Sequence, residues 1–137
     1  MIVIACLDEN GGMMFNHRRQ SQDRGLCDQI VKLAENAALH MNGYSARLFS
    51  HYRIPGLIVS DTFLQDAGEG EFCFVEDEAL VPVERRIEKL IIFKWNRIYP
   101  ADRYFDLPMD QGTWRLAYSK DFSGSSHRNI TMEVYER

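Results

Sequence analysis

The sequence predicts a single α/β domain with a central mixed β-sheet that is mostly parallel, ends in a C-terminal antiparallel hairpin and is flanked by helices. Three observations lead to this prediction. The chain opens with an apolar run, strand and helix patterns alternate over its first two thirds, and only β-rich segments follow near the C-terminus. With 137 residues, a second domain would leave each half too small to bury its own core.

Residues 1–7 form the apolar run, and the turn-forming residues 8–12 follow it, which predicts a central strand buried on both faces. After the polar stretch 16–21, apolar residues recur at helical spacing. They predict a helix over about residues 22–36, with Ser21 as its N-cap and Asp23 in its first turn.

Three short strands are expected in the middle of the chain, at residues 38–41, 56–60 and 71–75. A short helix capped by Ser45 separates the first two, and a loop at residues 66–70 precedes the third. Strands that alternate with helices require crossover connections, so these strands should run largely parallel.

The last third should contain a helical turn near residues 83–87, a strand at 89–95 and an irregular stretch at 99–102. Two β-rich segments, 113–120 and 129–137, are joined by a polar loop, which predicts an antiparallel hairpin.

The composition narrows the function classes. A net charge of -4 gives no general attraction to nucleic acid or to anionic membranes. No apolar run approaches the roughly 20 residues of a membrane span, and no targeting segment is evident, so a cytoplasmic location is expected. Three cysteines without CxxC spacing indicate reduced, buried thiols. Neither a metal-binding spacing nor a GxSxG, Walker A or GxGxxG motif occurs.

Five segments spread over most of the chain share a family pattern: Ile4-Ala5-Cys6-Leu7-Asp8 with Gly12-Met13, Leu39-His40-Met41-Asn42-Gly43-Tyr44-Ser45, Gly56-Leu57-Ile58-Val59-Ser60, Ala101-Asp102-Arg103-Tyr104-Phe105, and Ser126-His127 leading to Glu133-Val134-Tyr135. In these segments the chain resembles the dihydrofolate reductase family. The resemblance implies the reductase-like fold, a pterin-like substrate and an NADPH cofactor.

The chain departs from the family's pattern where the nucleotide would bind. Glu76-Asp77-Glu78 stands where the family has a Gly-Gly pair beside the pyrophosphate, and Gly43 stands where it has a phosphate-binding arginine. About a dozen residues replace the strand and helix that hold the adenosine end. Each close pair of like charges costs on the order of a kcal/mol at a protein surface. No cofactor is therefore expected, and NADPH remains only as the alternative.

Asp23 is the candidate catalytic residue, because it matches the family's acid that directs protonation of the pterin ring. The alternative is an ordinary helix N-terminal acid, which the helix dipole stabilises by about 0.3 to 1 kcal/mol. Phe93 replaces the family's threonine partner on the later strand, which favours that alternative. Asp28, one helical turn later, is the fallback candidate.

His17, Arg18, Arg19 and Arg24 form a basic cluster at the mouth of the expected pocket. The cluster is suited to an anionic ligand, a phosphate or an acidic partner, with the helix N-terminus as a further positive pole. The alternative is a solvated loop that offsets nearby acids. Arg53 lies close to the place where the family holds the substrate's carboxylate, shifted along the chain by about one residue, and an ordinary surface arginine is the safer interpretation.

These observations favour a binding or regulatory protein that uses a cleft around Phe15, Asp23 and Ser45, with Arg18 and Arg19 above it. The expected partner is a small anionic molecule or a protein, not nucleic acid or a membrane. The first alternative is an NAD(P)H-dependent reductase of a pterin-like or other small substrate, or one using a flavin. The second is a protein-interaction or inhibitor module that uses the acidic edge at residues 69–78.

Overall fold

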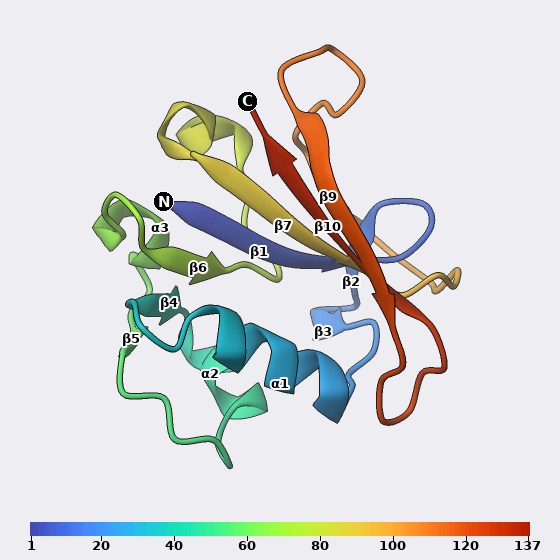
Figure 1. Ribbon diagram of the computed structural model, residues 1–137, viewed down its shortest axis with the longest axis horizontal. Helices are drawn as coiled ribbons and strands as arrows, with labels where there is room; N and C mark the ends of the chain where they lie inside the picture. Colours follow the sequence, from blue (N-terminus) through green and yellow to red (C-terminus); the bar gives the residue numbers. More distant parts are fainter.

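The apolar N-terminal run forms the centre of a seven-stranded sheet in the computed structural model, which describes residues 1–137. The strand order is β5-β4-β6-β1-β7-β10-β9 (Figure 1). These strands are β1 (Ile2–Leu7), β4 (Leu39–Met41), β5 (Leu57–Val59), β6 (Phe72–Phe74), β7 (Lys89–Lys94), β9 (Arg115–Phe122) and β10 (Ile130–Glu136).

The pairing agrees with the predicted fold class. β1 pairs in parallel with both β6 and β7, and β4 pairs in parallel with β5 and β6. β10 runs antiparallel to β7 and to β9, which gives the expected C-terminal hairpin. All parallel strands therefore end at one edge of the sheet, where side chains that follow β4 and β6 come together.

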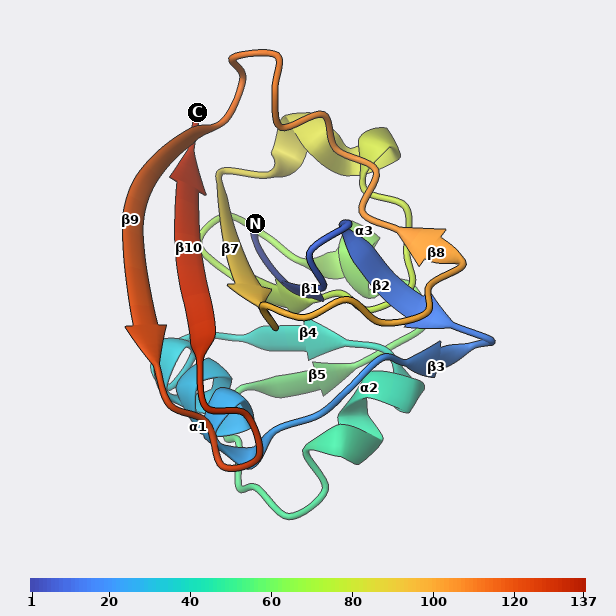
Figure 2. The same ribbon diagram turned by 90° about the vertical axis from the view of Figure 1, so that its right-hand side faces the viewer.

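A second, three-stranded sheet lies beside this edge and was not predicted (Figure 2). It consists of β2 (Gly12–Phe15), β3 (Arg18–Arg19) and β8 (Arg103–Tyr104), in the order β3-β2-β8. Asn16 and His17 connect β2 to β3 with positive φ angles of 51° and 61°. A two-residue turn with both central residues in the left-handed region matches the twist of a hairpin, and asparagine tolerates that region well.

The helices differ in detail from the prediction. α1 (Arg24–Leu33) begins after Asp23, which is its N-cap in place of Ser21. α2 (Gly43–Leu48) is capped by Asn42, whose side chain accepts the amide of Ser45, so Ser45 is not the cap. One turn, α3 (Phe63–Asp66), lies in a segment where no helix was expected, and the helical turn near β7 is a 3-10 helix at Val81–Arg86.

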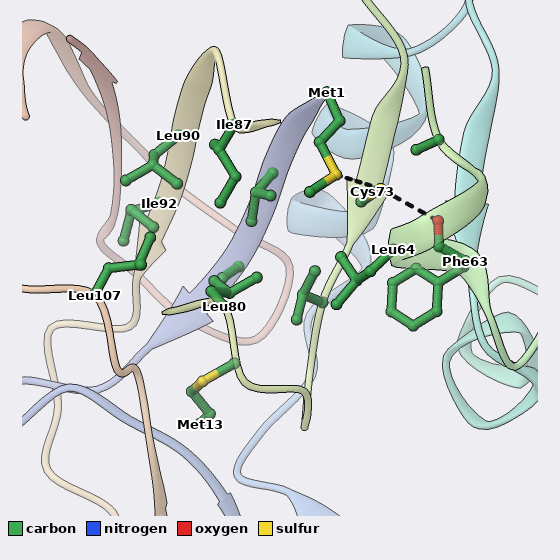
Figure 3. Close-up of a cluster of buried hydrophobic side chains, with 14 of the residues drawn as sticks. Met1, Met13, Phe63, Leu64, Cys73, Leu80, Ile87, Leu90, Ile92 and Leu107 are labelled. Atoms are coloured by element: carbon green, nitrogen blue, oxygen red, sulfur yellow. Dashed lines mark hydrogen bonds between the residues drawn. The ribbon is translucent and has the colours of Figure 1, made fainter. Parts of the chain in front are cut away.

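The sheet buries apolar side chains on both faces, because successive residues of a strand point to opposite sides. On one face, Val3 and Ala5 pack with residues of α3 and of the loops around the 3-10 helix, as Figure 3 shows for part of this cluster. On the other face, Ile4 and Phe93 pack against Ile30 of α1. None of the helices combines the length and the apolar character needed to cross a membrane.

Candidate functional site

Asp23 joins the start of α1 to the loop between β9 and β10. Its Oδ1 accepts the amides of Leu26 and Ser125, both at 3.0 Å, and its Oδ2 accepts the amides of Ser126 at 2.8 Å and His127 at 3.0 Å. The Ser126 hydroxyl and His127 Nδ1 lie 3.1 Å from the same Oδ2. Burial disfavours the charge, but the hydrogen bonds from Ser126, Ser125, Leu26 and His127 outweigh it and hold the pKa of Asp23 well below its ordinary value of 3.8.

The His127 imidazole is buried next to this carboxylate. Its Nε2 lies 3.0 Å from Ser21 Oγ and 3.1 Å from the Tyr99 hydroxyl, on the side of the ring opposite Asp23. The ring also packs on Trp95, with 4.7 Å between the ring centroids. Both imidazole nitrogens are therefore engaged, and the orientation of the ring is fixed.

Glu76 is the centre of a second buried network, at the end of β6. It accepts a bidentate pair from Arg19, with Nε 2.8 Å from Oε2 and Nη2 2.9 Å from Oε1, and the Ser45 hydroxyl donates to Oε1 at 2.8 Å. The Arg19 guanidinium stacks over the Tyr44 ring at 4.5 Å, and the Arg19 amide donates to the Tyr44 hydroxyl at 3.0 Å. These contacts attach the β2–β3 hairpin to α2 and to the carboxyl end of the sheet.

Little space remains between these two networks. The cavity that they enclose has a volume of about 20 Å³, and its apolar wall includes Cys6, Met13 and Trp95. A space of this size holds about one water molecule. Of the substrate-side cleft expected around Phe15, Asp23 and Ser45, the part between these two networks is therefore closed by the protein's own side chains, whereas Asp23 also borders a larger depression.

A larger depression, which we call the α1–α2 groove, runs between the two helices. It has a volume of about 890 Å³, and Arg24 and Asp28 of α1 face Arg47 of α2, with His51 and Tyr52 in the segment after α2. The guanidinium groups of Arg24 and Arg47 take part in none of the protein's salt bridges. Asp28 is the only solvent-exposed carboxylate that borders the groove, and it accepts a hydrogen bond from the Tyr52 hydroxyl.

The predicted site residues fall into separate places. Asp23 and Arg19 border both the small cavity and the α1–α2 groove, whereas Ser45 is buried behind Glu76 and borders neither. Phe15 and Arg18 border a different hollow of about 440 Å³, which Arg19 and Tyr99 border as well.

Arg53 and the acidic turn also lie apart from the groove. Arg53 borders a depression of about 430 Å³ on the far side of Asp28. In the turn, Asp77 is exposed and its Oδ1 lies 3.5 Å from Asn42 Nδ2. Burial and the neighbouring Asp77 raise the pKa of Glu78. Two carboxylates therefore remain near the surface of this turn, while Glu76 faces inward.

Sequence reasoning missed His127, Arg47 and Tyr52. Helical spacing gave a partial signal for Arg47, since it lies one turn after Gly43 in the predicted short helix. No local pattern marked His127, because its partners Asp23 and Ser21 are more than a hundred residues away along the chain. The structure contains no group of three or more His, Cys, Asp or Glu side chains that could hold a metal ion.

No protein-family model matches the sequence, and no curated protein matches it either. Among solved structures, the chain is similar to dihydrofolate reductase from Enterococcus faecalis complexed with NADP(H) and RAB-propyl. The TM-score is 0.69, the match covers 99% of this chain and 95% of that chain, and the sequence identity is 12%. The chain therefore has the dihydrofolate reductase fold, as the sequence segments indicated, and this low identity carries the likeness no further than the fold.

Proposed function

We propose that the protein binds a small anionic ligand in the α1–α2 groove and does not carry out NADPH-dependent reduction. The observation that carries this proposal is the pair of guanidinium groups, Arg24 and Arg47, that face the groove from its two helices without an acidic partner. Guanidinium groups bind carboxylates and phosphates through charged hydrogen bonds, often two at a time.

The charge balance of the groove supports an anion. Arg24 and Arg47 outnumber Asp28, the one exposed carboxylate of the groove, and Asp23 is shielded from a ligand because its carboxylate is buried and bonded to Ser125, Ser126 and His127. The N-terminus of α1, which the sequence suggested as a further positive pole, offers few free amides to a ligand. The Arg24 amide already donates to Ser125 Oγ at 3.0 Å, and the Leu26 amide donates to Asp23.

The size and the walls of the groove indicate the kind of ligand. A volume of about 890 Å³ lies within the range of small-molecule sites. Tyr44 and Tyr52 border the groove and offer aromatic surface beside the charged groups. We therefore favour a ligand that combines one or two anionic groups with an apolar or aromatic body.

The residues at the end of β6 do not fit a dinucleotide in the pose that the reductase fold implies. Asp77 and Glu78 would face the phosphates, and Arg19, the arginine bonded inside this region, is neutralised by Glu76. The cavity of about 20 Å³ has no room for a nicotinamide or pterin ring between the Asp23 and Glu76 networks. No catalytic step is therefore assigned to NADPH in this protein.

Isothermal titration with inorganic pyrophosphate and with citrate tests the proposal. We expect Arg24→Ala and Arg47→Ala each to weaken binding by roughly tenfold, which corresponds to about 1.4 kcal/mol. Arg53→Ala is the matched control, because it removes the same charge outside the groove. If the three variants bind alike, or if neither anion binds at roughly 10 mM, the groove is not an anion site.

A further inference from the structure

We propose that Ser21, His127 and Asp23 form a nucleophile, base and orienting acid that hydrolyse small carboxylic esters. This inference does not depend on the ligand proposed for the α1–α2 groove. It rests on a hydrogen-bonded chain of three side chains, in which Asp23 Oδ2 lies 3.1 Å from His127 Nδ1 and His127 Nε2 lies 3.0 Å from Ser21 Oγ. Both distances lie within the reach required for a base that activates a serine.

The surroundings fix the roles of the three groups. Asp23 is buried and accepts hydrogen bonds from four backbone amides, which keep its carboxylate ionised. An ionised carboxylate can only accept hydrogen bonds, so each of its neighbours must donate one. The His127 proton is therefore assigned to Nδ1, facing Asp23, which leaves the lone pair of Nε2 directed at Ser21. Ser21 Oγ has no other hydrogen-bond partner in the protein.

Two further features suit an acyl-transfer site. The backbone amides of Ser21 and Gln22 donate to no acceptor within the protein, so both are available to the oxyanion of a tetrahedral intermediate. Ser21 is partly exposed and borders the small cavity, which shares Gln22, Asp23 and Leu48 with the α1–α2 groove. Because the cavity holds only about one water molecule, the ester would lie in the α1–α2 groove, and only a small acyl group such as acetyl would reach Ser21.

The reaction uses only water as co-reactant. Ser21 Oγ forms a bond to the ester carbonyl carbon while its proton moves to His127 Nε2. The bond from that carbon to the leaving oxygen then breaks, and His127 returns the proton to the alcohol. Water attacks the acyl-serine with His127 again as base, which releases the carboxylic acid and restores Ser21.

Tyr99 modulates this arrangement. Its hydroxyl lies 3.1 Å from the same Nε2, so it competes with Ser21 for the lone pair of the base. Removal of that hydroxyl in Tyr99→Phe should leave Nε2 to Ser21 alone and raise the reactivity of the serine. A purely structural role for His127 predicts no such increase.

The test uses p-nitrophenyl acetate and a fluorophosphonate probe on the full chain, with the modified residue located by mass spectrometry. We expect a single adduct on Ser21, its loss in Ser21→Ala, a rate at least roughly 100-fold lower in His127→Gln, and a several-fold higher rate in Tyr99→Phe. Ser123→Ala is the control and should behave as wild type, because it removes an exposed hydroxyl from the β9–β10 loop that also carries His127.

Ser21→Ala should fold normally, since Ser21 makes one side-chain hydrogen bond, and circular dichroism checks this. No adduct on wild type, or an adduct on another residue that persists in Ser21→Ala, would overturn the proposal. A folded Tyr99→Phe variant that reacts no faster than wild type would overturn the assignment of His127 Nε2 as the base.

Discussion

Asp23 offers the most informative single substitution, Asp23→Asn, because its carboxylate joins α1 to the β9–β10 loop. The change keeps the size of the side chain and replaces one acceptor oxygen with an NH2 donor. In either orientation of the amide, that donor faces backbone amides that also donate, those of Leu26 and Ser125 or those of Ser126 and His127.

The expected loss follows from these contacts. Hydrogen bonds to a charged group contribute about 1.5 to 3 kcal/mol each, and a buried donor left without an acceptor costs about 1 to 3 kcal/mol. Since the replaced oxygen leaves two amides unsatisfied, we expect the free energy of unfolding to fall by about 3 to 5 kcal/mol. Domains of this size have a total stability of about 5 to 15 kcal/mol, so the loss is large but the protein should still fold.

Urea unfolding followed by tryptophan fluorescence measures this loss, because Trp95 packs on His127 and reports on the same region. Asp28→Asn is the matched control, with an expected loss under about 1 kcal/mol, since Asp28 is exposed and accepts only the Tyr52 hydroxyl. A loss for Asp23→Asn no larger than that of the control would refute the assignment of Asp23 as the joining group.

The pH dependence gives an independent check. The pKa of Asp23 is depressed in the folded protein, so its stabilisation is complete above the ordinary value of 3.8 and is lost as the pH falls below it. The advantage of wild type over Asp23→Asn should therefore stay constant near neutral pH and shrink below about pH 3.8. An advantage that grows on acidification would contradict this sign.

Three other outcomes use the same unfolding assay or a simple thiol titration. Gly124→Ala should destabilise the protein by about 2 to 4 kcal/mol, because the added Cβ would lie 2.6 Å from Asp23 Cγ. Gly43→Ala is the control: open space surrounds Gly43, so this change should be neutral or stabilise by up to about 1 kcal/mol. Glu76→Gln should cost about 3 to 5 kcal/mol, since it leaves a partly buried Arg19 without its counter-charge, and a loss below 1 kcal/mol would contradict the network. Burial raises the pKa of Cys27 and Cys73 to about 12, so neither thiol should react with Ellman's reagent at pH 8 until the protein unfolds.

The sheet could be predicted because its signals are local. Continuous apolar runs marked β1 and β7, and alternation of apolar and polar residues marked the buried face of β10. The directions of the strands then followed from their connections, because helical crossovers join parallel strands and a short loop joins antiparallel ones. The β2–β3 hairpin was missed even though Asn16 is a residue that tolerates a left-handed turn. The flanking strands are too short, at four and two residues, to show an alternating pattern.

The site could be predicted only in part, because its decisive contacts join distant segments. Ser21 and Asp23 are both good N-cap residues, and the choice between them depends on amides a hundred residues later in the chain. Glu76 was grouped with its acidic neighbours, whereas its environment is set by Arg19, more than fifty positions earlier. Composition shows which charges are present but not how they pair.

The side chains that fill the space between the Asp23 and Glu76 networks leave no room for a nicotinamide ring there. Titration of the protein with NADPH, followed by quenching of tryptophan fluorescence, tests this, because Trp95 lines the small cavity. We expect no saturable change up to millimolar NADPH. Saturable quenching at micromolar NADPH would show that a dinucleotide binds here after all, and it would restore the reductase alternative.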